Sequence, residues 1–72
     1  MPRDVILNSV RELRAEGRIT QEELAQAMGV SRQTINSLER GRYIPSLPLA
    51  LRIAEYFNRP VESIFSLKDP AG

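Results

Sequence analysis

The sequence predicts a small all-α fold of five helices, and three features of its 72 residues lead to that class. Apolar residues recur at helical spacing through most of the chain. Capping residues precede these stripes, and glycine, asparagine or proline follows them. The length suffices for one compact core. Residues 1–72 are therefore expected to form a single domain, with a two-stranded antiparallel sheet between the terminal segments as an optional addition.

The first segment of the chain fits either a strand or a helix. Val5–Leu7 is a short apolar run that favours a strand, and Asn8 or Ser9 would then cap a first helix over about residues 9–16. The alternative starts the helix near Asp4, because apolar residues on both sides of Asn8 also fit one helical stripe. The strand is the preferred interpretation, with a glycine at position 17 ending the helix that follows.

Two short helical patterns joined by a glycine occupy residues 20–41. Thr20 can cap the first helix, and the glutamate three residues later completes a capping box. Gly29 follows the last apolar residue of that stripe, where a positive φ ends a helix without steric cost. Ser31 can cap a second helix, which ends near Gly41. The expected unit is a helix, a short turn and another helix.

The second helix of this unit has one apolar and one polar face. Ile35 and Leu38 lie three residues apart and are expected to face the core. The polar residues left on the outer surface are Arg32, Gln33, Asn36 and Ser37. Arginine can bind O6 and N7 of guanine, and glutamine or asparagine can bind N6 and N7 of adenine. This face therefore has the chemistry for reading bases in the major groove of DNA.

Positive charge gathers near this face although the net charge is only +1. Between residues 30 and 43, Arg32, Arg40 and Arg42 are opposed by Glu39 alone. The other six glutamates all lie outside this segment. A local basic surface of this kind suits the phosphate contacts on which DNA affinity depends.

The stretch TQEELAQAMGVSRQTINSLERG resembles the Cro/repressor-type (xenobiotic-response-element-like) helix-turn-helix family in its leading Gln, LA pair, turn Gly, SRQTI run and ERG ending. The likeness extends from Val10 to Leu67, since PSLPLALRIAEYF resembles the next helix of the family. It implies a lambda-repressor-like five-helix domain with the helix-turn-helix at about 20–41. It also implies a sequence-specific transcriptional regulator of double-stranded DNA, a homodimeric repressor on a near-palindromic operator.

Site residues follow from the helix faces and from this resemblance. The expected base contacts are Ser31, Arg32, Gln33, Asn36 and Ser37. The expected phosphate contacts are Thr20, Gln21, Thr34, Arg40, Arg42 and Tyr43, although Tyr43 could instead stack on the domain. The family's pattern also pairs a basic residue of the first helix with the acid that closes the recognition helix. Arg14 and Glu39 match these two positions, as a structural ion pair.

The rest of the chain supplies a fourth and a fifth helix. Ser46 caps the fourth, which Asn58 ends. Pro60 opens a short last helix over Val61–Phe65, and Ser66–Lys68 could pair antiparallel with the strand at 5–7. The expected apolar face of the fourth helix consists of Leu47, Ala50, Leu51, Ala54 and Phe57.

Apolar residues in short surface segments indicate a dimer interface within about 44–67. If Ile64 faces the core, then Phe65 points roughly 100° away on a helix and needs another cover. Ile44 and Val61 each lie next to a proline in segments that meet at the ends of the fourth helix. The expected interface residues are Ile44, Pro45, Val61, Ile64, Phe65 and Leu67.

The composition argues against other classes of protein. The chain has no cysteine and no histidine, so thiol nucleophiles, thiolate metal sites and the commonest general base are missing. We expect no catalytic residue, no metal and no cofactor, and no small-molecule effector is indicated. No apolar run approaches the roughly 20 residues that span a membrane, and MPRDVILNSV has no signal-peptide pattern. The expected location is the cytoplasm.

An alternative interpretation is an antitoxin-like or other protein-interaction module that uses the same domain. Its partner would need an additional surface or tail. The five expected helices use nearly all of the sequence, so DNA binding is the preferred interpretation.

Overall fold

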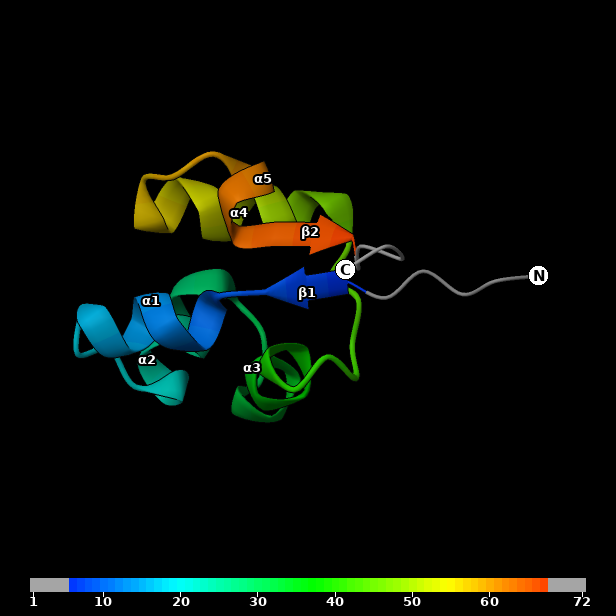
Figure 1. The fold of residues 1–72 in the computed structure, drawn as a ribbon. Helices are drawn as coiled ribbons and strands as arrows, with labels where there is room; N and C mark the ends of the chain where they lie inside the picture. The colour runs from blue at the N-terminus through cyan, green and yellow to red at the C-terminus, as the bar shows by residue number, and fades with distance from the viewer. Residues whose placement is uncertain (1–5, 68–72) are drawn as a thin grey trace.

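The computed structural model describes residues 6–67, which form five helices and one two-stranded sheet (Figure 1). The elements are β1 (Ile6–Asn8), α1 (Val10–Glu16), α2 (Gln21–Met28), α3 (Arg32–Glu39), α4 (Leu47–Phe57), α5 (Val61–Ile64) and β2 (Phe65–Leu67). The predicted class, five helices with a small antiparallel sheet, is confirmed.

The sheet joins the two ends of the described chain. β1 and β2 are antiparallel, with Ile6 opposite Leu67 and Asn8 opposite Phe65. The strand interpretation of the first segment is therefore correct for residues 6–8, whereas positions 4, 5 and 68 lie outside the described residues. The predicted end of the last helix was one residue too late. Phe65 has extended backbone angles, φ −117° and ψ 136°, because it already pairs with β1.

Asn8 both caps α1 and ties it to α3. Its Oδ1 accepts a hydrogen bond from the backbone N–H of Val10 at 3.1 Å, and its Nδ2 donates to the carbonyl of Leu38 at 2.9 Å. Of the two candidate caps, Asn8 and not Ser9 supplies the side-chain bond. α1 stops at Gly17 as expected, but the left-handed residue is its neighbour Arg18, with φ 56°.

The helix-turn-helix unit begins and turns where the sequence predicted. The backbone N–H of Glu23 donates to the Thr20 hydroxyl at 3.0 Å, and the backbone N–H of Thr20 donates to the Glu23 carboxylate at 2.8 Å. Gly29 follows α2 with φ 73°, and apart from its immediate neighbours in the chain no atom lies within 4 Å of where its Cβ would be. Glycine is thus favoured there by backbone conformation and not by crowding. Ser31 caps α3 by accepting from the backbone N–H of Thr34 at 3.1 Å.

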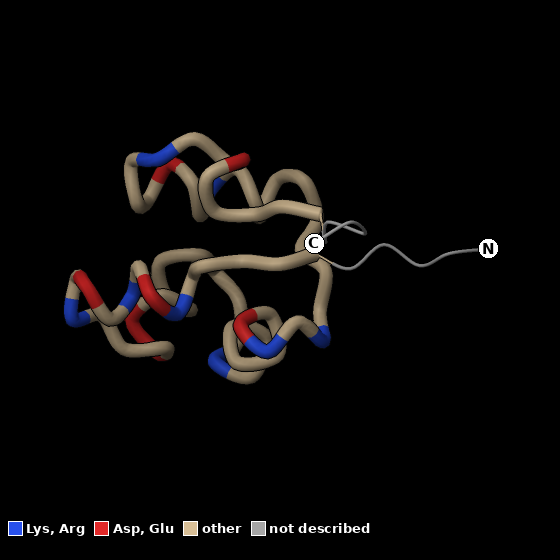
Figure 2. The backbone as a smooth tube through the Cα atoms, in the orientation of Figure 1, with Lys and Arg blue, Asp and Glu red and all other residues tan. Residues whose placement is uncertain are grey.

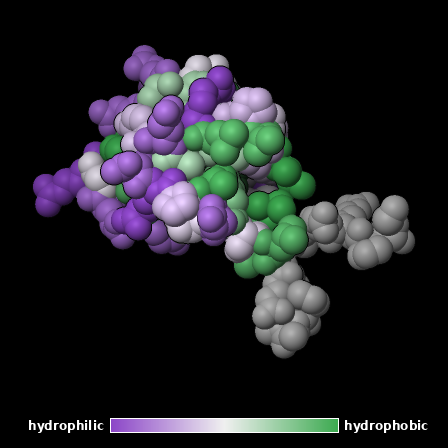
Figure 3. Space-filling model, turned by 90° about the horizontal axis from the view of Figure 1, so that it is seen from above, coloured by the Kyte–Doolittle hydropathy of each residue, from purple (hydrophilic) through white to green (hydrophobic). Residues whose placement is uncertain are grey.

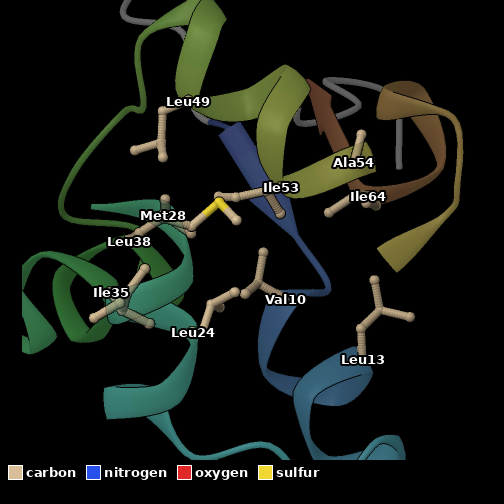
Figure 4. Close-up of a cluster of buried hydrophobic side chains, with 11 residues drawn as sticks. Val10, Leu13, Leu24, Met28, Ile35, Leu38, Leu49, Ile53, Ala54 and Ile64 are labelled. Atoms are coloured by element: carbon tan, nitrogen blue, oxygen red, sulfur yellow. The ribbon is translucent and has the colours of Figure 1, made fainter. Parts of the chain in front are cut away.

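The core is formed by side chains from all five helices (Figure 4). By the exposure of the whole residue, no polar or charged residue among those described is buried with them. Five of the apolar side chains are almost completely enclosed, namely Val10, Leu24, Ile35, Leu38 and Ile53. α2 and α3 pack closely on each other, while α4 closes the opposite side of the core.

The predicted apolar face of α4 was partly wrong. Its inward residues are Leu49, Ala50, Ile53 and Ala54. Leu47 and Leu51 point outward and are 68% and 49% exposed. α4 is apolar on almost every side, so two helical stripes fit its sequence equally well, and packing against the other helices selects one of them. Two leucines are left on the surface.

The elements lie in two groups (Figure 1). α4, α5 and β2 lie on one side, and α1, α2 and α3 lie on the other. α3 faces away from the α4–α5 side, so its outer surface is free of other elements. Within residues 6–67, no helix has the length and apolar character needed to cross a membrane.

Candidate nucleic-acid interface

A network of hydrogen bonds fixes the C-terminal end of α3 against α1 and α2. Arg14 donates from Nε to Glu39 Oε2 at 2.7 Å and from Nη2 to Oε1 at 3.1 Å. Its Nη1 donates to the carbonyl of Ile19 at 2.9 Å, and Gln21 Nε2 donates to Glu39 Oε1 at 3.1 Å. One carboxylate thus links three helices through the residues expected to form an ion pair.

This pair is more enclosed than a surface ion pair. The Glu39 side chain is 3% exposed and that of Arg14 is 18% exposed. The hydrogen bond to Glu39 and its negative charge raise the pKa of Arg14 above the usual value, against the opposing effect of burial. Arg14 therefore stays charged and paired, and its guanidinium group is held by protein partners.

The outer face of α3 carries the residues expected to read bases. Ile35 and Leu38 are fully buried, which turns the opposite side of the helix outward. Arg32 and Gln33 are exposed at the N-terminal end of α3, next to the exposed Ser31. The two residues one turn further on, Asn36 and Ser37, are half-buried. The exposed donors and acceptors are thus concentrated in the first turn of the helix.

The start of α2 lies beside this first turn. Thr20, Gln21 and Arg32 line one open hollow, together with Arg14 and Glu22. The Thr20 hydroxyl is part of the capping box, and the Gln21 amide donates to Glu39. The backbone N–H groups of the first turn of α2 add the positive end of a helix dipole to this hollow.

The remaining predicted phosphate contacts lie elsewhere along α3. Arg40, Arg42 and Tyr43 are exposed at its C-terminal end, where Arg40 lines a second hollow that also includes Gln21. Thr34 is half-buried, and its hydroxyl lies 2.9 Å from the Ser31 hydroxyl. The candidate phosphate contacts therefore form two groups, one at each end of the recognition helix.

Charge near α3 is more positive than a residue count suggests. Figure 2 shows basic positions along α3 and the loop that follows it, with a single acidic position among them. That position is Glu39, whose charge is compensated by Arg14. Among residues 6–67, the exposed arginines of this segment form no ion pair, although Glu22 lines the same hollow as Arg32. Sequence analysis missed one further arginine, Arg11 of α1, which faces this region beside Arg40.

The predicted dimer residues do not form one surface. Ile64 is only 3% exposed and belongs to the core, so its assignment to an interface was wrong. Val61 and Phe65 are half-buried and pack against the core. Ile44 and Leu67 are exposed, and Pro45 is half-buried.

Exposed apolar side chains occur instead around the start of α4. Leu47 and Leu51 lie one turn apart on its outer side, and Ile44 precedes them in the loop. Figure 3, which looks onto the α4 side, shows apolar side chains gathered on part of this surface. We refer to Ile44, Leu47, Leu51 and Leu67 as the apolar patch.

A capped helix, a glycine turn and a second helix with a polar outer face define a helix-turn-helix DNA-binding domain. A model of the helix-turn-helix family matches residues 10–64. The chain belongs to this family, in its Cro/repressor-type branch, whose members are transcriptional regulators and not enzymes.

Individual relatives agree with this assignment. The chain is 48% identical over 62 residues to an uncharacterized HTH-type transcriptional regulator of Methanocaldococcus jannaschii, which covers 86% of this chain and 94% of the relative. The SOS-response transcriptional repressor LexA from Eubacterium rectale has a similar structure, with a TM-score of 0.76, 31% identity and coverage of 86% and 66%. The restriction-modification controller protein C.AhdI from Aeromonas hydrophila has a TM-score of 0.67 at 32% identity, with coverage of 74% and 80%.

Proposed function

We propose that this DNA-binding regulator is a repressor that binds a near-palindromic operator as a homodimer, with α3 of each subunit in the major groove. The observation that carries the proposal is the outer face of α3. Arg32 and Gln33 project there from the first turn of a helix whose other side is locked into the core. The structural similarity to LexA, a transcriptional repressor, supports the direction of regulation.

The base-reading role belongs to the first two turns of α3. An α-helix about 10–12 Å across fits a major groove about 12 Å wide. Arg32 and Gln33 are exposed and long enough to reach base edges, and each ends in a planar group. The guanidinium of Arg32 only donates, whereas the amide of Gln33 donates through its nitrogen and accepts through its oxygen. Arg32 would pair with guanine and Gln33 with adenine. The other candidates for base contacts, Ser31, Asn36 and Ser37, have shorter side chains and would reach less far into the groove.

The two groups of phosphate contacts would set the register of α3 in the groove. At the start of α2, the backbone N–H groups beside Thr20 and Gln21 offer donors and a positive dipole end to one strand. At the other end of α3, Arg40, Arg42 and Tyr43 would bind the backbone from an exposed segment. The side chains of Thr34 and Gln21 have less access than the other four, because both residues are half-buried and are hydrogen-bonded to Ser31 and Glu39.

Homodimerisation is assigned to the apolar patch. Contiguous exposed apolar surface commonly marks an interface, and a two-fold pairing needs only one self-complementary surface. Leu47 and Leu51 replace Val61 and Phe65 as central contacts, and the exposed Ile44 and Leu67 complete the proposed interface. Val61, Phe65 and Pro45 contribute at most their partly exposed edges. The two recognition helices must then lie about 34 Å apart to meet successive major grooves.

Selection of bound duplexes from a random double-stranded DNA pool tests the proposal. We expect enrichment of an inverted repeat whose half-sites are centred about one helical turn apart. Enrichment of a single half-site would retain sequence-specific binding and reject the dimer. No enrichment would reject specific DNA reading and favour the alternative, an antitoxin-like or other protein-interaction module that uses the apolar patch.

A further inference from the structure

We infer that Arg11 and Arg40 together bind one phosphodiester of the DNA backbone, in a hollow between α1 and the C-terminal half of α3. This inference rests on the proposed DNA binding and adds a contact site on α1. The residues that line the hollow are Arg11, Arg14, Gln21, Asn36, Glu39 and Arg40. The hollow is open to solvent, as a site for a continuous polymer backbone must be.

The hollow has a positive charge that the protein leaves unpaired. Arg14 and Glu39 compensate each other at its base. Arg11 and Arg40 are exposed, and within residues 6–67 neither takes part in an ion pair or a side-chain hydrogen bond. Two guanidinium groups can therefore contribute donors to one anion. Arginine forms paired hydrogen bonds with phosphate, and such charge-assisted bonds are stronger than neutral ones.

Asn36 connects the hollow to the recognition surface. Arg32, Asn36 and Arg40 are spaced by four residues, so they form one row along α3 that is about 12 Å long. Asn36 and Arg40 line this hollow, whereas Arg32 lines the hollow at the start of α2. Both hollows thus lie along the same flank of α3.

This flank would face one strand of the DNA backbone. A helix nearly fills the width of the major groove, so its two flanks lie beside the sugar–phosphate walls. The start of α2 would hold one phosphate of that strand, and Arg11 with Arg40 would hold another farther along it. α1 would then hold the recognition helix in two ways, through the ion pair of Arg14 with Glu39 and through the phosphate contact of Arg11.

The first test compares salt dependence of binding to the selected duplex for the wild type, Arg11→Gln and Arg59→Gln. Arg59 is the matched control, because it is an exposed arginine that follows α4, across the molecule from α3 (Figure 1). We expect Arg11→Gln to lower the salt slope by about one unit per subunit, or about two for the bound dimer, and to weaken binding by at least roughly 5- to 10-fold at 0.1 M salt. Arg59→Gln should bind as the wild type does. Thermal melting of the free proteins checks that both variants fold.

The second test places a neutral methylphosphonate at each backbone position of the duplex in turn. One position should weaken the wild type more than it weakens Arg11→Gln or Arg40→Gln, because each variant has lost one of the two arginines that hold this phosphate. The inference is overturned if Arg11→Gln binds like Arg59→Gln, or if both hollow variants remain as sensitive as the wild type at every position. A wild type that binds no duplex would instead reject the proposed function itself, and this inference with it.

Discussion

At the scale of single residues, we expect base reading by α3 to be separable from positioning by the segment that follows it. We expect Gln33→Ala to cost about 1–3 kcal/mol on the preferred site and to relax the choice at one base pair of each half-site, because the outward amide loses its base. Arg42→Ala should weaken binding to all duplexes and lower the salt slope by about one unit. Filter binding on the preferred and on a scrambled duplex measures both. Equal losses on the two duplexes for both variants would contradict this division.

The position of Gln21 was predictable from the sequence, but its side-chain contact was not. Its position at the start of α2 was readable from the capping box, and this led to a phosphate role. Its side-chain amide instead donates to Glu39, a residue 18 positions away. Local spacing cannot reveal such a contact, because it depends on how α2 and α3 pack. The backbone N–H groups of the same turn remain the better candidates for phosphate binding.

At the scale of elements, Glu39 holds α1, α2 and α3 in one arrangement. Glu39→Gln keeps the shape of the side chain but removes the charge that compensates Arg14. Since the Glu39 side chain is almost fully enclosed, we expect the free energy of unfolding to fall by about 1–3 kcal/mol. Urea denaturation measures this change, and operator binding should weaken as α3 loses its fixed orientation.

The matched control is the other ion pair among residues 6–67. Glu16 and Arg59 lie 3.6 Å apart with side chains that are 68% and 50% exposed. Glu16→Gln makes the same chemical change in a pair screened by water, so stability should change by less than about 1 kcal/mol. A similar fall in the free energy of unfolding for Glu39→Gln and Glu16→Gln would mean that the enclosure of Glu39 does not strengthen its ion pair.

The elements also show which sequence signals were sufficient. Side-chain caps and positive-φ residues placed the ends of α2 and the start of α3, because these signals act between neighbours in the chain. The phase of α4 was not predictable in this way. Its sequence is apolar on nearly every side, and only contact with α2 and α5 decides that Leu49 and Ile53 turn inward while Leu51 does not.

At the scale of the whole molecule, the orientation of α4 determines where the surface is apolar. The core is complete without Leu47 and Leu51, since the inward side of α4 already fills it. These leucines therefore add nothing to the interior, although each exposes apolar area to water in the isolated subunit. The DNA-reading face of α3 lies on a different side (Figure 1). One molecule can thus contact a second copy and an operator at the same time.

Leu51→Asp should separate dimerisation from folding. The substitution occurs twice in a two-fold interface, so we expect the dimer to lose on the order of 2–4 kcal/mol, or about 30- to 1,000-fold in dissociation constant. The melting temperature at low protein concentration should change little, because Leu51 already faces solvent.

Tyr56→Asp is the control, because Tyr56 is another exposed apolar residue of α4 and lies roughly 140° around the helix from Leu51. Sedimentation equilibrium should find wild type and Tyr56→Asp dimeric at tens of micromolar, and Leu51→Asp monomeric with weakened operator binding. A monomeric wild type would reject the homodimer, whereas a dimer disrupted by Tyr56→Asp and not by Leu51→Asp would move the interface away from the apolar patch.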